Sequence, residues 1–124
     1  MAKQGRKIMV IDDSITNVIL LEAILNIRGY NAITALNAKD AFPLIEKEKP
    51  ELILLDLFMP ETSGFELLKI IKSNEAIKNI PVIIVSAVTD DYNILKSKAL
   101  GAIDFIKKPI DIQLLIEKIE EVIS

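Results

Sequence analysis

Five side chains that can bind or accept a phosphoryl group come just after apolar runs in the sequence of this 124-residue chain. They are the carboxylates of Asp12, Asp13 and Asp56, the hydroxyl of Ser86 and the ammonium of Lys108. An aspartate can attack phosphorus as a nucleophile, and three neighbouring carboxylates repel each other unless a cation such as Mg²⁺ lies among them. A lysine and a hydroxyl can bind further phosphate oxygens. Each aspartate or serine alone could simply cap a helix or form a turn, and a lysine before a proline is usually a solvated loop charge. The set together indicates phosphoryl transfer to a carboxylate.

Strands and helices alternate along the chain, which places these side chains at one edge of a sheet. Apolar runs bounded by turn-forming residues predict strands over Lys7–Ile11, Asn31–Ala35, Leu52–Leu55, 82–85 and 102–106. Apolar residues at helical spacing predict helices from Ile15 until Gly29, from Asn37 to Glu48, and over 65–73, 92–100 and Ile112–Ile123. This alternation implies a parallel sheet with helices on both faces, and ligands of such sheets bind beyond the carboxyl ends of the strands.

The second helix contains a conflict between its expected cap and a proline. If Asn37 caps this helix, Pro43 occupies the sixth helical position, where proline removes a backbone hydrogen bond and clashes with the preceding turn. Two alternatives follow: the helix begins later, near Ala41, or it begins after Asn37 and is kinked.

Composition excludes several classes of function. A net charge of −3 argues against a general nucleic-acid binder. Without cysteine and histidine the chain cannot form disulfides, thiolate or histidine zinc sites, or the triads of Ser-His-Asp and Cys-His hydrolases. A metal ion would therefore have to be a hard cation held by oxygen. Since no apolar run suits a membrane span or a signal peptide, we expect a cytoplasmic protein.

Four motifs of the chain resemble those of one family, the receiver domains of two-component response regulators (CheY-like). They are Ile-Asp-Asp-Ser at 11–14, Leu-Asp-Leu-Phe-Met-Pro at 55–60 with Gly64, Val-Ser-Ala at 85–87, and the stretch 101–109 that ends in Phe-Ile-Lys-Lys-Pro. The resemblance extends from Lys7 to Ile123. It implies an α/β, flavodoxin-like (βα)5 doubly wound fold whose five-stranded parallel sheet has the order 2-1-3-4-5. We expect a single receiver domain over residues 1–124, with a core of about 7–123 and no output domain.

The resemblance also implies a role for each site residue. Asp56 would be the phosphoacceptor, and Ser86 and Lys108 would bind the phosphoryl group. Mg²⁺, or alternatively Mn²⁺, would be bound by Asp13, Asp56 and the backbone carbonyl of Phe58, with Asp12 acting through water. Ser86 and Phe105 would form the switch. Ser86 stands where threonine is the commoner residue of the family, so the hydroxyl is kept and a methyl group is lost.

The partners implied by the resemblance are a phosphohistidine donor, either a sensor histidine kinase or a histidine phosphotransfer protein, and a downstream protein whose identity the sequence does not give. The surface expected to change is formed by helix 92–100, strand 102–106 and helix Ile112–Ile123. It includes Tyr92, Leu95, Lys96, Ala99, Lys107 and Ile112. We expect no direct contact with nucleic acid or membrane, and a monomer or a dimer linked to phosphorylation. The protein would be a signalling receiver rather than an enzyme, assisting only its own phosphorylation and slow autodephosphorylation.

Two apolar residues are expected to set how long the phosphoryl group lasts. Phe58 and Val88 lie two residues after Asp56 and Ser86, at positions that flank the phosphate in the family. Neither side chain can orient an attacking water, so we expect slow loss of phosphate.

Three other interpretations compete with a phosphorylated receiver. Within the fold they are a flavodoxin-like binder, and a phosphatase that uses Asp56 as a transient nucleophile. A haloacid-dehalogenase-type phosphatase would carry a second aspartate where this chain has Phe58, which argues against it. The third is a pseudo-receiver that acts only as a protein-binding module, which the presence of all five site residues disfavours.

Overall fold

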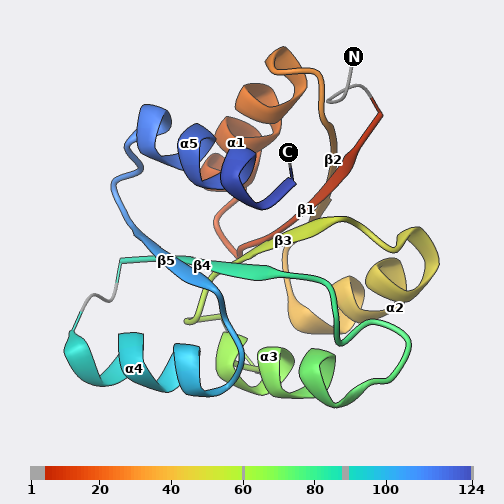
Figure 1. The fold of residues 1–124 in the computed structure, drawn as a ribbon, viewed down its shortest axis with the longest axis vertical. Helices are drawn as coiled ribbons and strands as arrows, with labels where there is room; N and C mark the ends of the chain where they lie inside the picture. Colours follow the sequence, from red (N-terminus) through yellow and green to blue (C-terminus); the bar gives the residue numbers. More distant parts are fainter. Residues whose placement is uncertain (1–4, 60, 88–89, 124) are drawn as a thin grey trace.

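The computed structural model describes residues 5–59, 61–87 and 90–123. This part of the chain contains five strands, β1 (Lys7–Ile11), β2 (Asn31–Ala35), β3 (Leu52–Leu55), β4 (Val82–Ser86) and β5 (Asp104–Lys107). The helices that alternate with them are α1 (Ile15–Ile27), α2 (Ala38–Glu48), α3 (Gly64–Ser73), α4 (Asp91–Ala99) and α5 (Ile112–Ile123) (Figure 1).

The strands form one parallel sheet in the order β2-β1-β3-β4-β5, which confirms the expected flavodoxin-like topology. Ile11 at the end of β1 lies opposite Ala35 of β2 and Leu55 of β3, so three strands end at the same level. The ladder continues one residue further, because the Asp56 N–H donates to the Ile11 carbonyl at 2.9 Å and the Asp12 N–H donates to the Ala35 carbonyl at 3.2 Å. This register brings Asp12 and Asp56 side by side.

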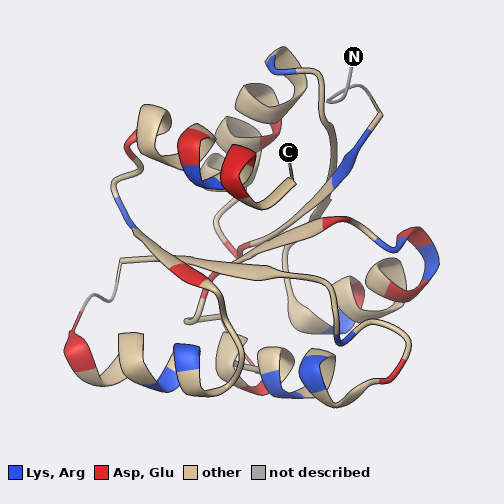
Figure 2. Cartoon of the chain, in the orientation of Figure 1, with Lys and Arg blue, Asp and Glu red and all other residues tan. Residues whose placement is uncertain are grey.

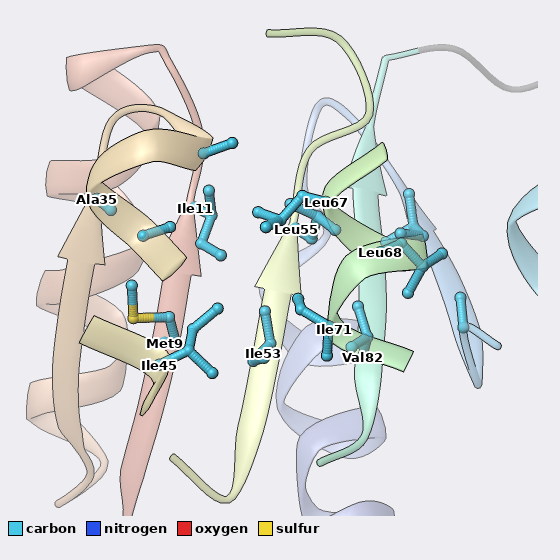
Figure 3. Close-up of a cluster of buried hydrophobic side chains, with 14 of the residues drawn as sticks. Met9, Ile11, Ala35, Ile45, Ile53, Leu55, Leu67, Leu68, Ile71 and Val82 are labelled. Carbon is cyan, nitrogen blue, oxygen red and sulfur yellow. The ribbon is translucent and has the colours of Figure 1, made fainter. Parts of the chain in front are cut away.

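Helices cover both faces of the sheet, α1 and α5 on one side and α2, α3 and α4 on the other (Figure 1). Alternate residues of each strand enter separate cores, so that Ile8 and Val10 pack under α1 and α5 while Met9 and Ile11 pack under α2 and α3. Figure 3 shows the second of these clusters, which is built almost entirely from aliphatic side chains. The strands that read as continuous apolar runs are therefore buried on both faces, as predicted.

Helix α2 begins directly after Asn37, so the alternative start near Ala41 is wrong. The Asn37 side chain accepts a hydrogen bond from the Asp40 N–H at 2.8 Å, and the helix then runs without interruption through Pro43. Pro43 removes one backbone donor from the helix interior. The cap and the burial of Ala41 and Ile45 in the core offset this loss.

Several element ends differ from the predicted ones by one or two residues. α3 and α4 each begin one residue earlier, because Ser63 and Asp90 accept hydrogen bonds from backbone N–H groups of their first turns. β5 begins at Asp104 instead of residue 102. The Ala102 N–H donates to the carbonyl of Ser97 in α4, so this residue still belongs to the turn behind the helix.

The loop before β4 contributes to the core, although its sequence is largely polar. Ile77 is 1% exposed and joins the cluster under α2 and α3. The ammonium of Lys72 stabilises this loop by donating to the carbonyls of Lys78 at 3.0 Å and Ile80 at 2.7 Å. Burial lowers the pKa of Lys72, which is consistent with its position between the helix and the loop.

Gly64 allows helix α3 to begin directly against the end of β3. Its N–H donates to the Leu57 carbonyl at 2.8 Å. A Cβ atom at this position would lie 2.7 Å from the Leu57 Cα and closer still to the Asp56 carbonyl oxygen. The backbone that carries Asp56 therefore requires glycine here because of close approach, which is one of the uses of that residue.

We predict that Gly64→Ala lowers the free energy of unfolding by about 1–3 kcal/mol, because the added methyl group forces the backbone at Asp56 and Leu57 to move. Urea denaturation followed by circular dichroism measures this change. Ser73→Ala, at the exposed end of the same helix, serves as the control and should stay within about 0.5 kcal/mol of wild type. Equal stability of Gly64→Ala and wild type would show that the contact is not rigid.

Candidate functional site

The carboxyl ends of β1 and β3 bring three aspartates into one cluster. Asp12 and Asp56 are buried, with 2% and 7% of their surface exposed, whereas Asp13 is exposed. Each of the three offers a carboxylate oxygen, and these oxygens all lie within 4.8 Å of one another. The structure thus assembles the acidic group that the sequence predicted at this edge.

Lys108 reaches this cluster from the chain after β5, the strand at one edge of the sheet. Its ammonium lies 2.6 Å from Asp12 Oδ2 and 3.4 Å from Asp56 Oδ2. Its backbone N–H donates to the Ser86 carbonyl at 3.0 Å, which fixes the chain behind β5 against the end of β4. The hydroxyl-bearing Ser86 is 1% exposed, so four of the five predicted residues meet in a largely buried environment.

Burial dominates the electrostatics of Asp56 and raises the pKa of its carboxyl group above the ordinary value. The Lys108 ammonium lowers this pKa, the Asp12 carboxylate raises it, and hydrogen bonds from Ser86 and from the Phe58 N–H lower it. For Lys108 burial acts to lower the pKa, but its contacts with the two aspartates prevail and the pKa is raised. Lys108 is therefore a cation at neutral pH.

The charges and ligand types of this cluster fit a hard divalent cation. Three carboxylates face one ammonium here, so negative charge is left over when all three are ionised. Mg²⁺ and Mn²⁺ prefer oxygen ligands of this kind. A cation among the carboxylates would also stabilise the ionised form of Asp56 and so counteract the effect of burial, which raises its pKa.

Backbone groups hold two of the carboxylates in place. The Ser14 N–H donates to Asp12 Oδ1 at 2.9 Å, while the Ser14 hydroxyl caps α1 by accepting from the Asn17 N–H. The Phe58 N–H lies 3.4 Å from Asp56 Oδ1. The loops after β1 and β3 therefore orient the carboxylates as well as carry them.

The remaining predicted residues lie at different depths. Phe105 on β5 is half-buried and packs against the core under α2 and α3. Phe58 is 50% exposed, and its ring meets the ring of Phe65 edge to face, with centroids 6.3 Å apart. Sequence reasoning gave Phe65 no role beyond the start of a helix. Val88 lies outside the described residues.

The family model described as "Response regulator receiver domain" matches residues 8–120, nearly the whole chain. The chain belongs to this family. Receiver domains are signalling modules.

Relatives of this receiver differ in how much of their length it accounts for. It is 33% identical to the phosphate regulon transcriptional regulatory protein PhoB of Pseudomonas aeruginosa, covering 96% of this chain and 52% of that protein. It is 39% identical to sporulation initiation phosphotransferase F of Bacillus subtilis, over 87% of this chain and 86% of that protein. Among solved structures, the chemotaxis protein CheY4 of Vibrio cholerae superposes with a TM-score of 0.90 at 26% identity, covering 95% and 98%.

The surface of this receiver carries both signs of charge. Figure 2 shows acidic and basic positions interspersed along the helices. Within the described ranges, no helix is both long enough and apolar enough to cross a bilayer.

We predict that Asp56→Asn is more stable than wild type above about pH 7 and that this difference shrinks toward about pH 4. A carboxyl whose pKa is raised on folding holds more protons in the folded than in the unfolded state, so wild type loses stability as pH rises through the folded pKa. The amide variant has no such loss. Urea denaturation at a series of pH values measures the effect.

Asp104→Asn is the matched control, with the opposite sign. Burial acts to raise the pKa of Asp104, but the hydrogen bonds from Lys118 at 2.7 Å and from the Phe105 N–H at 2.8 Å prevail and lower it. This variant should therefore be less stable than wild type at neutral pH and approach it as the pH falls through the carboxyl range. If Asp56→Asn also loses stability at neutral pH, the account of Asp56 given above is wrong.

Proposed function

We propose that this receiver accepts a phosphoryl group on Asp56 and acts as a phosphorylation-dependent signalling switch. The observation that carries the proposal is the position of Asp56. It directly follows the central strand β3, and its carboxylate lies beside Lys108 and close to Asp12 and Asp13. A nucleophilic carboxylate surrounded by a cation and further oxygen ligands is what phosphoryl transfer to aspartate requires.

The donor in this proposal is a phosphohistidine of a sensor histidine kinase or of a histidine phosphotransfer protein. A carboxylate oxygen of Asp56 attacks phosphorus, so that a P–O bond forms and the P–N bond to the imidazole breaks. The imidazole nitrogen leaves with the electron pair of that bond and takes up a proton. Lys108 and the Ser86 hydroxyl bind oxygens of the transferred group and stabilise its negative charge.

Mg²⁺, with Mn²⁺ as an alternative, would be held by Asp13, Asp56 and the backbone carbonyl of Phe58, with Asp12 acting through water. The ion would supply neutralisation of the charge that develops on the phosphoryl oxygens. Asp13 would then bind the ion directly and Asp12 would bind it through water, while the hydrogen bond from the Ser14 N–H keeps the Asp12 carboxylate oriented.

The proposed output surface consists of α4, β5 and α5. Ser86 ends β4, and Phe105 lies on the neighbouring strand β5, so a shift of the Ser86 hydroxyl toward a phosphate would change the packing available to Phe105. Tyr92, Leu95 and Ile112 of this surface are 69%, 67% and 46% exposed. Apolar side chains exposed in this way suit contact with a downstream protein.

We predict that acetyl phosphate with Mg²⁺ adds one phosphoryl group to wild type and none to Asp56→Asn. The amide cannot act as the nucleophile, and intact-protein mass spectrometry gives the number of groups. Asp104→Asn keeps the site intact and should label like wild type. A wild-type protein that neither labels nor binds Mg²⁺ would favour the alternative of a pseudo-receiver that works as a protein-binding module.

We further predict that Phe58→Asn combined with Val88→Glu shortens the half-life of the acyl phosphate, because polar side chains beside the phosphate can orient water for attack. Decay of the labelled protein, followed by mass spectrometry after removal of acetyl phosphate, gives the rate. Val88→Ile keeps an apolar side chain and leaves the Phe58 ring in place, so it should leave the rate unchanged. Equal half-lives for the double variant and wild type would remove these residues from the control of phosphate lifetime.

A further inference from the structure

Helix α4 is held to the domain by few buried side chains. Of its described residues Asp91–Ala99, Ser97 is the one that is buried, and the Ser97 hydroxyl donates to the Ile94 carbonyl of the same helix. Helices with little buried apolar surface have low local stability. Contacts at the edge of α4 therefore contribute a large share of what fixes its position.

One such contact joins α4 to the start of α3. The Lys96 ammonium lies 4.3 Å from the centroid of the Phe65 ring and 6.0 Å from that of Tyr92, one turn earlier on its own helix. A lysine over an aromatic face is attracted by the ring quadrupole within about 6 Å. Lys96 thus bridges two helices through the face of Phe65.

The contact continues to the candidate phosphorylation site. Phe65 meets the Phe58 ring edge to face at 82°, a preferred geometry for aromatic pairs. Phe58 in turn places its N–H 3.4 Å from Asp56 Oδ1. A continuous series of contacts therefore connects Asp56 to α4 through Phe58, Phe65 and Lys96, here called the aromatic clasp.

We propose that Lys96 is a positioning residue of the phosphorylation site, which acts through Phe65 and Phe58 on the loop behind Asp56. This inference rests on the proposed function, in which the Phe58 backbone supplies a metal ligand. By holding the Phe65 ring, against which the Phe58 ring packs, Lys96 keeps the loop in the arrangement that meets the cation. Because coupling between two sites is reciprocal, cation binding at Asp56 would in turn make α4 more rigid.

Charge alone does not explain the placement of Lys96. Among the ion pairs of the described residues, the lysine partners of acidic groups are Lys7, Lys78, Lys108 and Lys118. Lys96 instead faces two aromatic rings. Lys98 lies two positions along α4, where a helical side chain points away from that of Lys96, so it offers a control of equal charge on the same helix.

The decisive experiment titrates Mg²⁺ into wild type, Lys96→Met, Lys96→Arg and Lys98→Met by isothermal titration calorimetry. Lys96→Met should weaken Mg²⁺ binding about two- to fivefold, the factor that a cation–π contact at an exposed site supplies. Lys96→Arg restores a cation over the ring and should bind like wild type, as should Lys98→Met. In a Phe65→Leu background, Lys96→Met should cause no further loss, since the ring it acts on is gone.

Hydrogen exchange provides a readout that does not depend on affinity. Mg²⁺ should slow exchange of the α4 amides in wild type and Lys96→Arg, and this slowing should be absent in Lys96→Met. A general loss of stability in Lys96→Met would raise exchange with and without Mg²⁺ but leave the slowing in place, which would overturn the inference.

The outcomes separate this inference from the proposed function. If wild type binds Mg²⁺ and labels at Asp56 while Lys96→Met matches it in both affinity and exchange, the aromatic clasp is only a surface contact and the inference fails alone. If wild type itself neither labels nor binds Mg²⁺, the proposed function fails and the role of Lys96 fails with it.

Discussion

The site depends on the contact between Lys108 and Asp12, which joins the chain after β5 to the chain after β1 at the carboxyl ends of the strands. Lys108 follows β5 and Asp12 follows β1, and β4 and β3 lie between these strands. Three strand spacings amount to about 14 Å in a flat sheet, so the Lys108 and Asp12 side chains have to extend toward each other across the ends of β4 and β3 to reach their 2.6 Å contact. The hydrogen bond from the Lys108 N–H to the Ser86 carbonyl keeps the chain after β5 beside the end of β4.

The same contact explains why the protein tolerates acidic groups beside its core. Asp12 and Asp56 are almost fully buried at the ends of apolar strands, where an unpaired carboxylate is costly. Lys108 offsets part of the cost for both. Hydrogen bonds from the Ser14 N–H to Asp12, and from Ser86 and the Phe58 N–H to Asp56, offset more of it. One ammonium cannot neutralise three aspartates, so the site remains attractive to a cation and to the charged group that such a cation binds.

Local patterns predicted most of this arrangement, and the misses have physical causes. The predicted bounds of strands β1 to β3 and helix α5 agree with those in the structure, because hydrophobic runs and turn residues mark both of their ends. The strand order came from resemblance to a family, since periodicity says nothing about which strands are neighbours. β5 was placed too early because the turn at Ala102 depends on a hydrogen bond to Ser97, which only the folded chain forms. The contact between Lys96 and Phe65 had no local signal for the same reason.

The loose attachment of α4 also has a practical consequence for observing this protein. Leu95 lies on its outer surface, 67% exposed, and the chain contains no cysteine. A single cysteine introduced at that position would take up a thiol-reactive dye without any competing thiol. The helix whose packing is least secured by buried side chains could thus carry an optical reporter, and the core would need no change to accommodate it.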